Sequence, residues 1–272
     1  MTYSQIQEAT EYIQKQSNDF IPEHGIILGT GLGALINDVD VKYSISYEDI
    51  PHFPIATVET HSGKLHLGTL SGKNVIVMQG RFHHYEGYSM KQVVFPVQVM
   101  KLLGIKKLYV SNASGGLNPN YKVSDLMIIK DHINLQYENP LRGANIDELG
   151  SRFPDMSEPY NFDMITKAEE IAREYKIKVH IGVYVSVPGP NLETRAEYNY
   201  LRIIGGDNVG MSTVPEVIAA AQMELPTFAI SVITDMGIPA LLKKANISNI
   251  IAAAMKAEPG MTKIIRELIA GS

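Results

Sequence analysis

Residues 107–116, KLYVSNASGG, decide the fold class of this chain. The apolar run 107–110 has the composition of a buried strand, and it runs directly into the small and polar cluster 111–116. Strands of a parallel sheet covered on both faces are almost continuously apolar, and ligands bind where such strands end. The stretch therefore predicts an α/β fold with candidate binding residues at the carboxyl end of a strand.

The same pattern recurs along the chain. Further apolar strands that end in glycine, polar or charged residues are expected at 25–28, 73–78, 181–185 and 227–233. Amphipathic or apolar helices are expected at 3–15, 92–103, 194–201, 214–223 and 249–269. No repeat, low-complexity tract or linker marks a boundary. We therefore expect a single domain, residues 1–272, built on a twisted mixed, largely parallel sheet flanked by helices.

Composition excludes several classes of protein. The 272 residues include no cysteine, which excludes a disulfide-stapled fold and a thiolate metal site, and the net charge of −5 offers no basic surface for nucleic acid. No stretch reaches the roughly 18 uninterrupted apolar residues of a membrane span, and the first residues do not resemble a signal peptide. The charged fraction, 19%, favours a large core or a buried subunit interface. We expect a cytoplasmic protein without nucleic-acid or membrane partners.

The glycine-rich segment 29–33, GTGLG, follows the first expected strand. Small residues let backbone N–H groups approach an anion, and the Thr30 hydroxyl can donate as well. With Ala34 the segment also satisfies the loose G-x-G-x-x-A fingerprint of dinucleotide-binding proteins. A purely structural turn would have the same composition, so this segment alone does not decide between the alternatives.

The segment 81–86, RFHHYE, is more specific. An arginine side chain offers a planar pair of donors suited to phosphate. Alternate residues of an extended chain point the same way, so Arg81, His83 and Tyr85 are expected to face one cavity. No metal is expected, because the histidines of this region, His61 among them, lack a recognisable ligand spacing.

The segment 211–216, MSTVPE, has the features of a helix start. Ser212 or Thr213 is the expected cap, Pro215 suits the first turn, and Glu216 complements the helix dipole. This terminus would also suit a phosphate. Together the clusters suggest an anion site formed by Thr30, Arg81, His83 and Ser212.

An ordered series of motifs extends this interpretation. In chain order they are GTGLG (29–33), HSG (61–63), QGRFHHYEGY (79–88), NASGGLNP (112–119), DHIN (131–134), NPLRG (139–143), RFP (152–154), GPNLET (189–194) and GMSTVPEV (210–217). In these motifs and their order the sequence resembles the trimeric class of purine nucleoside phosphorylases, which also includes methylthioadenosine phosphorylases. The resemblance covers residues 25 to about 235.

The resemblance implies a nucleoside phosphorylase-like fold and a pentosyltransferase of purine salvage. Purine nucleoside and phosphate would be converted reversibly to free purine and ribose (or 2′-deoxyribose) 1-phosphate. The expected partners are these substrates and two further copies of the chain in a homotrimer. No cofactor is expected, since inorganic phosphate is a co-substrate.

Site residues follow from the resemblance, motif by motif. The residues expected to bind phosphate are Thr30, His61, Arg81, His83, Ala113 through its backbone N–H, and Ser212. The residues expected to contact the nucleoside are Tyr85, Phe153 from a neighbouring subunit, Leu192, Glu193, Val209, Met211, Asp235 and Ile247. The expected catalytic residues are His83, Glu193 and Asp235.

The identity of the base is the open question. An ionised Glu193 would accept the N1–H of hypoxanthine or guanine, which adenine lacks. Asp235 departs from the Asn of 6-oxopurine enzymes and matches methylthioadenosine phosphorylases. Leu192 replaces an aromatic residue, and Ile247 falls where a histidine often binds the ribose 5′-hydroxyl. We expect inosine and guanosine as first substrates, adenosine as a poorer one, and an adenosine or methylthioadenosine phosphorylase as the alternative.

Two other classes remain as alternatives. An NAD-dependent dehydrogenase would bind pyrophosphate at 29–34 and ribose at Glu48 or Asp49, but it leaves the cluster 81–85 unexplained. A nucleoside-binding module without turnover would need the same pocket. Phosphate-dependent release of hypoxanthine from inosine separates the three.

Overall fold

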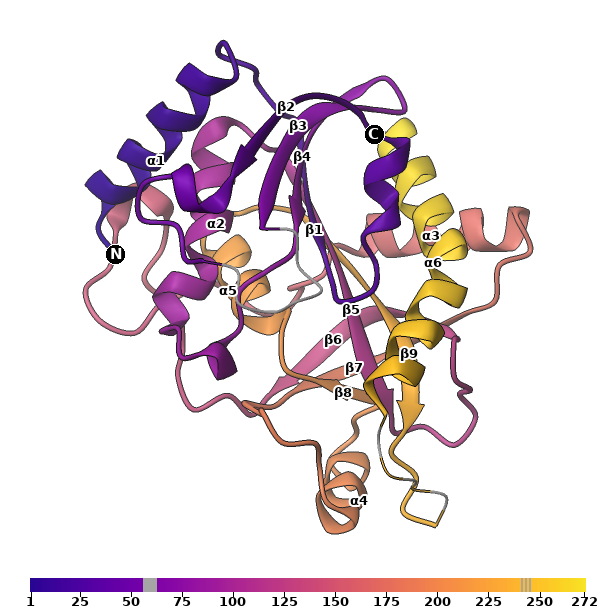
Figure 1. Ribbon diagram of the computed structural model, residues 1–272. Coiled ribbons are helices and arrows are strands. Elements are labelled where there is room, and N and C mark those ends of the chain that lie inside the picture. Colours follow the sequence, from indigo (N-terminus) through magenta and orange to yellow (C-terminus); the bar gives the residue numbers. More distant parts are fainter. Residues whose placement is uncertain (56–62, 241, 243, 245) are drawn as a thin grey trace.

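The computed structural model describes residues 1–55, 63–240, 242, 244 and 246–272, and within them nine strands form one twisted sheet (Figure 1). Its order is β2-β3-β4-β1-β5-β8-β7-β6-β9. The strands are β1 (His24–Leu28), β2 (Asp40–Ser46), β3 (Lys64–Leu70), β4 (Lys73–Gln79), β5 (Lys107–Gly116), β6 (Leu126–Asn134), β7 (Val179–Ser186), β8 (Asn208–Gly210) and β9 (Thr227–Met236). The helices are α1 (Tyr3–Gln16), α2 (Met90–Leu103), α3 (Phe162–Glu174), α4 (Arg195–Ile203), α5 (Val214–Gln222) and α6 (Ile247–Ala270).

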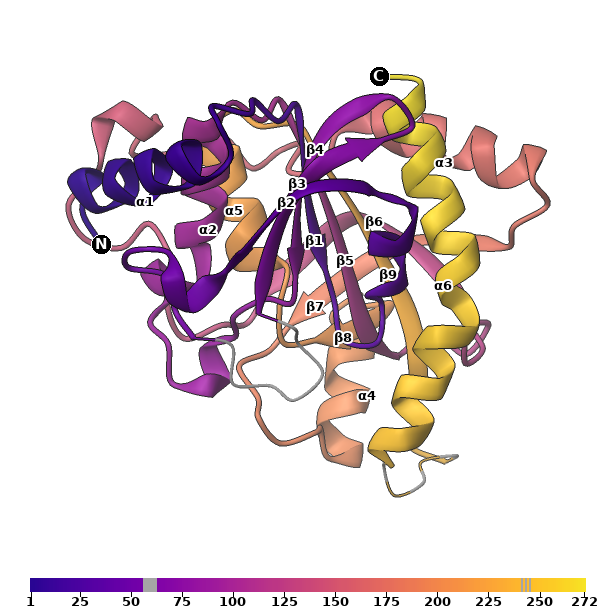
Figure 2. The same ribbon diagram turned by 45° about the horizontal axis from the view of Figure 1, so that its top comes forward.

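Parallel strands form the centre of the sheet. β1 lies between β4 and β5 and is parallel to both, whereas β2 and β3 extend the sheet as antiparallel strands. β5 also pairs with β9 in parallel, so that β5, β8, β7, β6 and β9 close into a ring (Figure 2). The α/β class with a mixed, mainly parallel sheet is confirmed.

Helices cover both sides of the sheet, as Figure 1 shows. α1, α2 and α5 pack in sequence on one side, and α3 packs against α6 on the other. α6 begins at the cap Asn246, whose side chain accepts the N–H groups of Ser248 and Asn249. Its buried residues recur every three or four positions, among them Ala254, Ala257, Met261, Ile264 and Leu268. This stripe packs on β9 and carries the helix past the carboxyl ends of the strands.

The expected elements are present, and their ends agree to within a few residues. β2, β3, β6, β8 and α3 were not expected. β2 is an edge strand whose side chains are mostly exposed, so it contains no apolar run to mark it. The polar cluster 111–116 belongs to β5 itself and does not form a loop after it, because these residues pair with β9.

Candidate active site

A cavity of about 180 Å³ opens where strands of the sheet end. Thr30 follows β1, Arg81 follows β4, and β5 and β9 contribute residues directly. The loop before α4 supplies Leu192 and Glu193, and α6 supplies Ile250. The position agrees with the general rule for ligand sites in α/β sheets.

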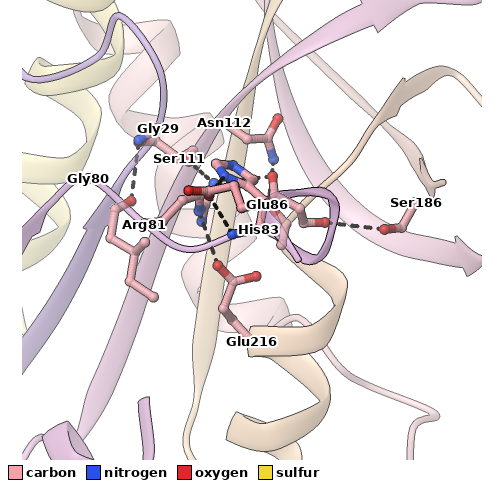
Figure 3. A network of polar contacts seen from close by, with 12 residues as sticks. Gly29, Gly80, Arg81, His83, Glu86, Ser111, Asn112, Ser186 and Glu216 are labelled. Atoms are coloured by element: carbon pink, nitrogen blue, oxygen red, sulfur yellow. Dashed lines mark hydrogen bonds and ion pairs between the residues drawn. The ribbon is translucent and has the colours of Figure 1, made fainter. Parts of the chain in front are cut away.

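The glycine-rich segment after β1 lies directly against β5. The Gly29 N–H donates to Ser111 Oγ at 3.2 Å, as Figure 3 shows. A Cβ at Gly29 would lie 2.8 Å from Asn112 Cα, so only glycine permits this approach. At the other end of the segment, the Ala34 N–H donates to the buried Glu258 carboxylate of α6 at 2.5 Å. Contacts with β5 and α6 thus hold the segment that carries Thr30.

Arg81 is the most buried cation of the cavity, with 2% of its side chain exposed. Its Nε donates to Glu216 Oε1 at 3.1 Å. Its Nη1 donates to Ser111 O at 2.9 Å and to Ser212 Oγ at 3.2 Å (Figure 3). The guanidinium is therefore held in one orientation by β5 and by the start of α5.

The helix start at 212–216 agrees with the sequence expectation except at its cap. Neither Ser212 nor Thr213 caps α5 with its side chain: Thr213 has a φ of 71°, and its hydroxyl accepts from Asn112 Nδ2 at 2.8 Å. Ser212 Oγ faces Arg81. Pro215 and Glu216 do lie in the first turn, as expected, and Glu216 is also buried there in an ion pair with Arg81. The expected capping side chains therefore form hydrogen bonds elsewhere: Ser212 with Arg81, which follows β4, and Thr213 with Asn112 of β5.

His83 is held by a carboxylate three residues further on. Its Nδ1 and its backbone N–H both lie 2.8 Å from Glu86 Oε1. Burial lowers the pKa of His83, and the hydrogen bond that His83 donates to Glu86 opposes this only in part, so the ring is neutral near pH 7. Since a carboxylate accepts, Nδ1 carries the proton. Tyr85 stacks on the ring at 4.6 Å, and burial raises the pKa of Tyr85 to about 12.

Two carboxylates lie at another part of the cavity wall. Asp235 accepts from Thr234 Oγ1 at 3.0 Å and stands opposite Gly115 in the β5–β9 register. Glu193 lies in the loop before α4 and lines the same cavity. Burial raises the pKa of both carboxyl groups, and the nearby Asp235 raises the pKa of Glu193 further. Both carboxyl groups therefore gain and lose a proton at a pH closer to neutral than the same groups would in water.

Most residues expected at the site line this single cavity. They are Thr30, Arg81, His83, Tyr85, Ala113, Leu192, Glu193, Val209, Met211, Ser212 and Asp235. His61 lies outside the described residues. Glu48 and Asp49, the ribose ligands of the dehydrogenase alternative, are exposed in the short helix η2 (Tyr47–Asp49) and do not line the cavity.

Two expected residues lie elsewhere. Phe153 is 85% exposed and lines a separate groove with His132 and Arg142. Ile247 is the first residue of α6, is 75% exposed and does not line the cavity. Ile250, three residues further along α6, lines it instead.

Sequence reasoning missed other wall residues, namely Asn112, Ser114, Gly115, Tyr198, Gly210, Thr234 and Ile250. Those on β5 lie within the quoted cluster 111–116 and could have been inferred from it. Tyr198 and Ile250 come from helices, where apolar or aromatic residues ordinarily indicate core packing. No local signal distinguishes them.

The described part of the chain contains neither a cluster of metal ligands nor a membrane-spanning helix. No group of three or more His, Asp or Glu side chains there could hold a metal ion. Among its helices, none has the length and apolar character required to cross a membrane.

Comparison with known proteins identifies the family. The family model described as "Phosphorylase superfamily" matches residues 23–270. Purine nucleoside phosphorylase 1 of Bacillus subtilis (strain 168) is 46% identical over 265 residues, which cover 97% of each chain. The crystal structures of Schistosoma mansoni purine nucleoside phosphorylase with adenosine and of a schistosoma purine nucleoside phosphorylase with hypoxanthine are each 42% identical to this chain. Each has a TM-score of 0.93 over 99% of this chain and 97% of its own. The chain therefore belongs to the phosphorylase superfamily and, within it, to the purine nucleoside phosphorylase family.

Proposed function

We propose that the protein is a purine nucleoside phosphorylase that cleaves inosine and guanosine, and their 2′-deoxy forms, with inorganic phosphate. The observation that carries the proposal is one cavity with anion donors on one wall and two carboxylates on another. The donors suit phosphate, and the carboxylates suit the N–H groups of a purine. Family membership supports the same reaction.

Phosphate is proposed to bind among Thr30, His61, Arg81, His83, the main chain of Ala113, and Ser212. Arg81 is fixed by Glu216 and Ser111 before phosphate arrives, so its charge needs little reorganisation. Ser212 accepts from Arg81 and can donate its own proton to a phosphate oxygen. His83, whose Nδ1 is hydrogen-bonded to Glu86, is held in a fixed orientation in this group.

The proposed step is a displacement at C1′ of the sugar. The C1′–N9 bond breaks with its electron pair going to the purine, and a phosphate oxygen forms the new bond to C1′. The transition state resembles an oxocarbenium ion, so the bound anion stabilises it as well as attacking. Tyr85 and Met211 are proposed to contact the ribose. Ile247 lies outside the cavity, so Ile250 is proposed to face the sugar in its place.

The leaving purine needs its negative charge neutralised at N7. Asp235 is proposed to supply a hydrogen bond there, since its raised pKa favours the protonated, donating form. Glu193 is proposed to accept the N1–H of a 6-oxopurine. Leu192 and Val209 are proposed to pack on the base. Adenosine then binds with a buried carboxylate unmatched, which makes it the poorer substrate.

Asp235 favours the alternative, an adenosine or methylthioadenosine phosphorylase. An ionised Asp235 could accept from the 6-amino group of adenine. The two possibilities make opposite predictions for the relative use of inosine and adenosine.

We further propose a cytoplasmic homotrimer with no cofactor besides its co-substrate phosphate. The exposed Phe153 supports the trimer, because a phenylalanine that is 85% exposed gains by burial against another subunit. Its proposed place is the nucleoside site of a neighbouring copy.

The deciding experiment follows hypoxanthine release from inosine with and without phosphate. Release that requires phosphate and yields ribose 1-phosphate supports the proposal. Release without phosphate, or no release in its presence, would reject it. Parallel measurement with adenosine and methylthioadenosine tests the alternative.

A further inference from the structure

One face of α6 lies along the glycine-rich segment 29–34. Ile250, Ala254 and Glu258 are spaced four residues apart on this helix, so they share that face. Ile250 lines the cavity. Ala254 is in close contact with the segment, because a Cβ built on Gly31 would lie 3.1 Å from the Ala254 Cβ. Glu258 reaches the end of the segment. The same face of α6 therefore extends from the cavity wall to the end of the segment.

Glu258 caps a helix whose own sequence supplies no capping side chain. The short 3-10 helix η1 (Ala34–Asp38) begins after Gly33, which makes no side-chain hydrogen bond to its first N–H groups. The Glu258 carboxylate is 6% exposed and accepts the Ala34 N–H at 2.5 Å. Such a hydrogen bond is stronger than one between neutral groups when the carboxylate is ionised. A residue 224 positions away in the chain thus performs the task of a local cap.

Thr30 lies at the corner of a turn between two fixed points. The Leu32 N–H donates to Gly29 O at 3.1 Å and closes the turn. Gly29 is held against β5. Gly31 has a φ of 71°, a conformation that favours glycine, and its missing Cβ allows the close approach to α6. The direction of the Thr30 side chain therefore depends on β5 at one side of the turn and on α6 at the other.

We propose that Glu258 is a positioning residue for phosphate, which holds Ala34 and thereby fixes the turn that presents Thr30 to the anion. The inference rests on the proposed function, and in particular on Thr30 as a phosphate ligand. Glu258 is not among the described residues that line the cavity, so it acts through the segment 29–34 and not on the substrates. Its loss should therefore weaken phosphate binding more than nucleoside binding.

Electrostatic repulsion and positioning predict opposite effects of Glu258 on phosphate. A carboxylate near an anion site repels phosphate, so removal of the charge alone should improve phosphate binding. Removal of the hydrogen bond should impair it, because the turn loses its tie to α6. Glu258→Ala removes both the charge and the hydrogen bond. Glu258→Gln removes the charge but keeps an oxygen that can accept the Ala34 N–H, so the two variants separate the two effects.

The test compares KM for phosphate with KM for inosine. In Glu258→Ala we expect KM for phosphate to rise about tenfold, the effect of losing a hydrogen bond to a charged group, and KM for inosine to change less than about twofold. Glu258→Gln should keep KM for phosphate within about threefold of the wild-type value. The matched control is Arg266→Ala, which breaks an ion pair of 3.0 Å between α6 and Asp38 at the other end of η1. It should leave both KM values within about twofold.

A double-mutant cycle with Thr30→Ala tests whether Glu258 acts through the turn. In the Thr30→Ala background, Glu258→Ala should change KM for phosphate little, because the side chain that it positions is gone. Glu258→Asp is the second variant should Glu258→Ala fail to fold. It keeps the charge, withdraws the carboxylate by one carbon and should raise KM for phosphate about threefold.

Thermal unfolding measures phosphate binding without turnover. Phosphate should raise the Tm of the wild type, and that of Glu258→Ala by less at the same concentration. The inference is overturned by an unchanged or lowered KM for phosphate in Glu258→Ala, by an equal rise in Glu258→Gln, or by an undiminished effect in the Thr30→Ala background. Wild-type protein that releases hypoxanthine with phosphate would still uphold the proposed function. A wild type without release, whose Tm shift with phosphate depends on Glu258, would reject the function and uphold the role of Glu258, so the two failures are distinguishable.

Discussion

Arg81 and Glu216 form a buried ion pair in which Nε and Oε1 lie 3.1 Å apart and the side chains are 2% and 3% exposed. The pair joins the end of β4 to the first turn of α5, two segments separated by 135 residues in sequence. It therefore couples the structural integrity of the fold to the orientation of the proposed phosphate ligand. A buried charge left without its partner destabilises a protein far more than the intact pair stabilises it.

Arg81→Ala should both destabilise the protein and weaken its use of phosphate. The free energy of unfolding should fall by about 3–5 kcal/mol, because Glu216 is left buried without its cation. The control is Arg266→Ala, which breaks an ion pair with Asp38 whose partners are 41% and 36% exposed and should cost less than about 1 kcal/mol. Urea unfolding and phosphate titration measure the two effects. Unchanged phosphate dependence in Arg81→Ala would refute the proposed phosphate site.

Substitutions of the two carboxylates should alter base preference in different ways. Asp235→Asn should lower the ratio of kcat/KM for adenosine to that for inosine. An ionised Asp235 has two oxygens that can accept from the 6-amino group of adenine, whereas Asn has only one and carries no charge. Glu193→Gln should reduce inosine turnover more than adenosine turnover. Steady-state kinetics with both nucleosides measure these ratios. A wild-type preference for adenosine, or a ratio that neither substitution moves, would assign base specificity to other residues.

Phe153→Ala should impair nucleoside binding without unfolding the chain. The side chain is 85% exposed in a single chain, so its loss leaves no cavity there, while a neighbouring active site loses an aromatic contact. The KM for inosine should rise about tenfold, and Phe162→Ala, at a second exposed phenylalanine, should leave it unchanged. Sedimentation of the wild type should give a trimer. A fully active monomer contradicts this prediction.

Stability should depend on pH through His24, a residue remote from the cavity at the start of β1. Burial lowers the pKa of His24 from 6.5 to about 4. As pH falls from 6.5 toward 4, the unfolded chain binds a proton that the folded chain does not, so folding becomes less favourable by up to about 1.4 kcal/mol per pH unit. Above pH 6.5 both states are neutral and this contribution is constant.

His24→Gln removes that titration and should flatten the dependence between pH 4 and 6.5. Urea unfolding at a series of pH values measures the slope for both proteins. Equal slopes for wild type and His24→Gln would mean that other groups govern the acid sensitivity. His66, His83 and His132, whose pKa values burial also lowers, are the next residues to test.

Much of the fold and of the cavity could be predicted from the sequence because short-range patterns encode them. Continuous apolar runs mark the buried strands. A segment such as 107–116 shows in its sequence where small and polar residues follow the apolar run of a strand. Arg81, His83 and Tyr85 all line the cavity, as expected, but not through the alternation of an extended chain, because Tyr85 lies in the short 3-10 helix η3 (His84–Glu86). The edge strand β2 escaped prediction, since its exposed side chains carry no apolar signal.

Only the tertiary structure decided which distant groups meet. Glu216 lies in the first turn of α5, as its sequence context predicts, but its ion pair with Arg81, which follows β4, is visible only in the fold. Tyr198 has the sequence signal of a core aromatic residue, yet it lines the cavity. By itself the sequence determined the α/β class, the strand ends and the types of chemistry available there. Pairings across the fold depend on packing between elements, which the local periodicity of a chain does not contain. The partners of Arg81 therefore emerged from the structure alone.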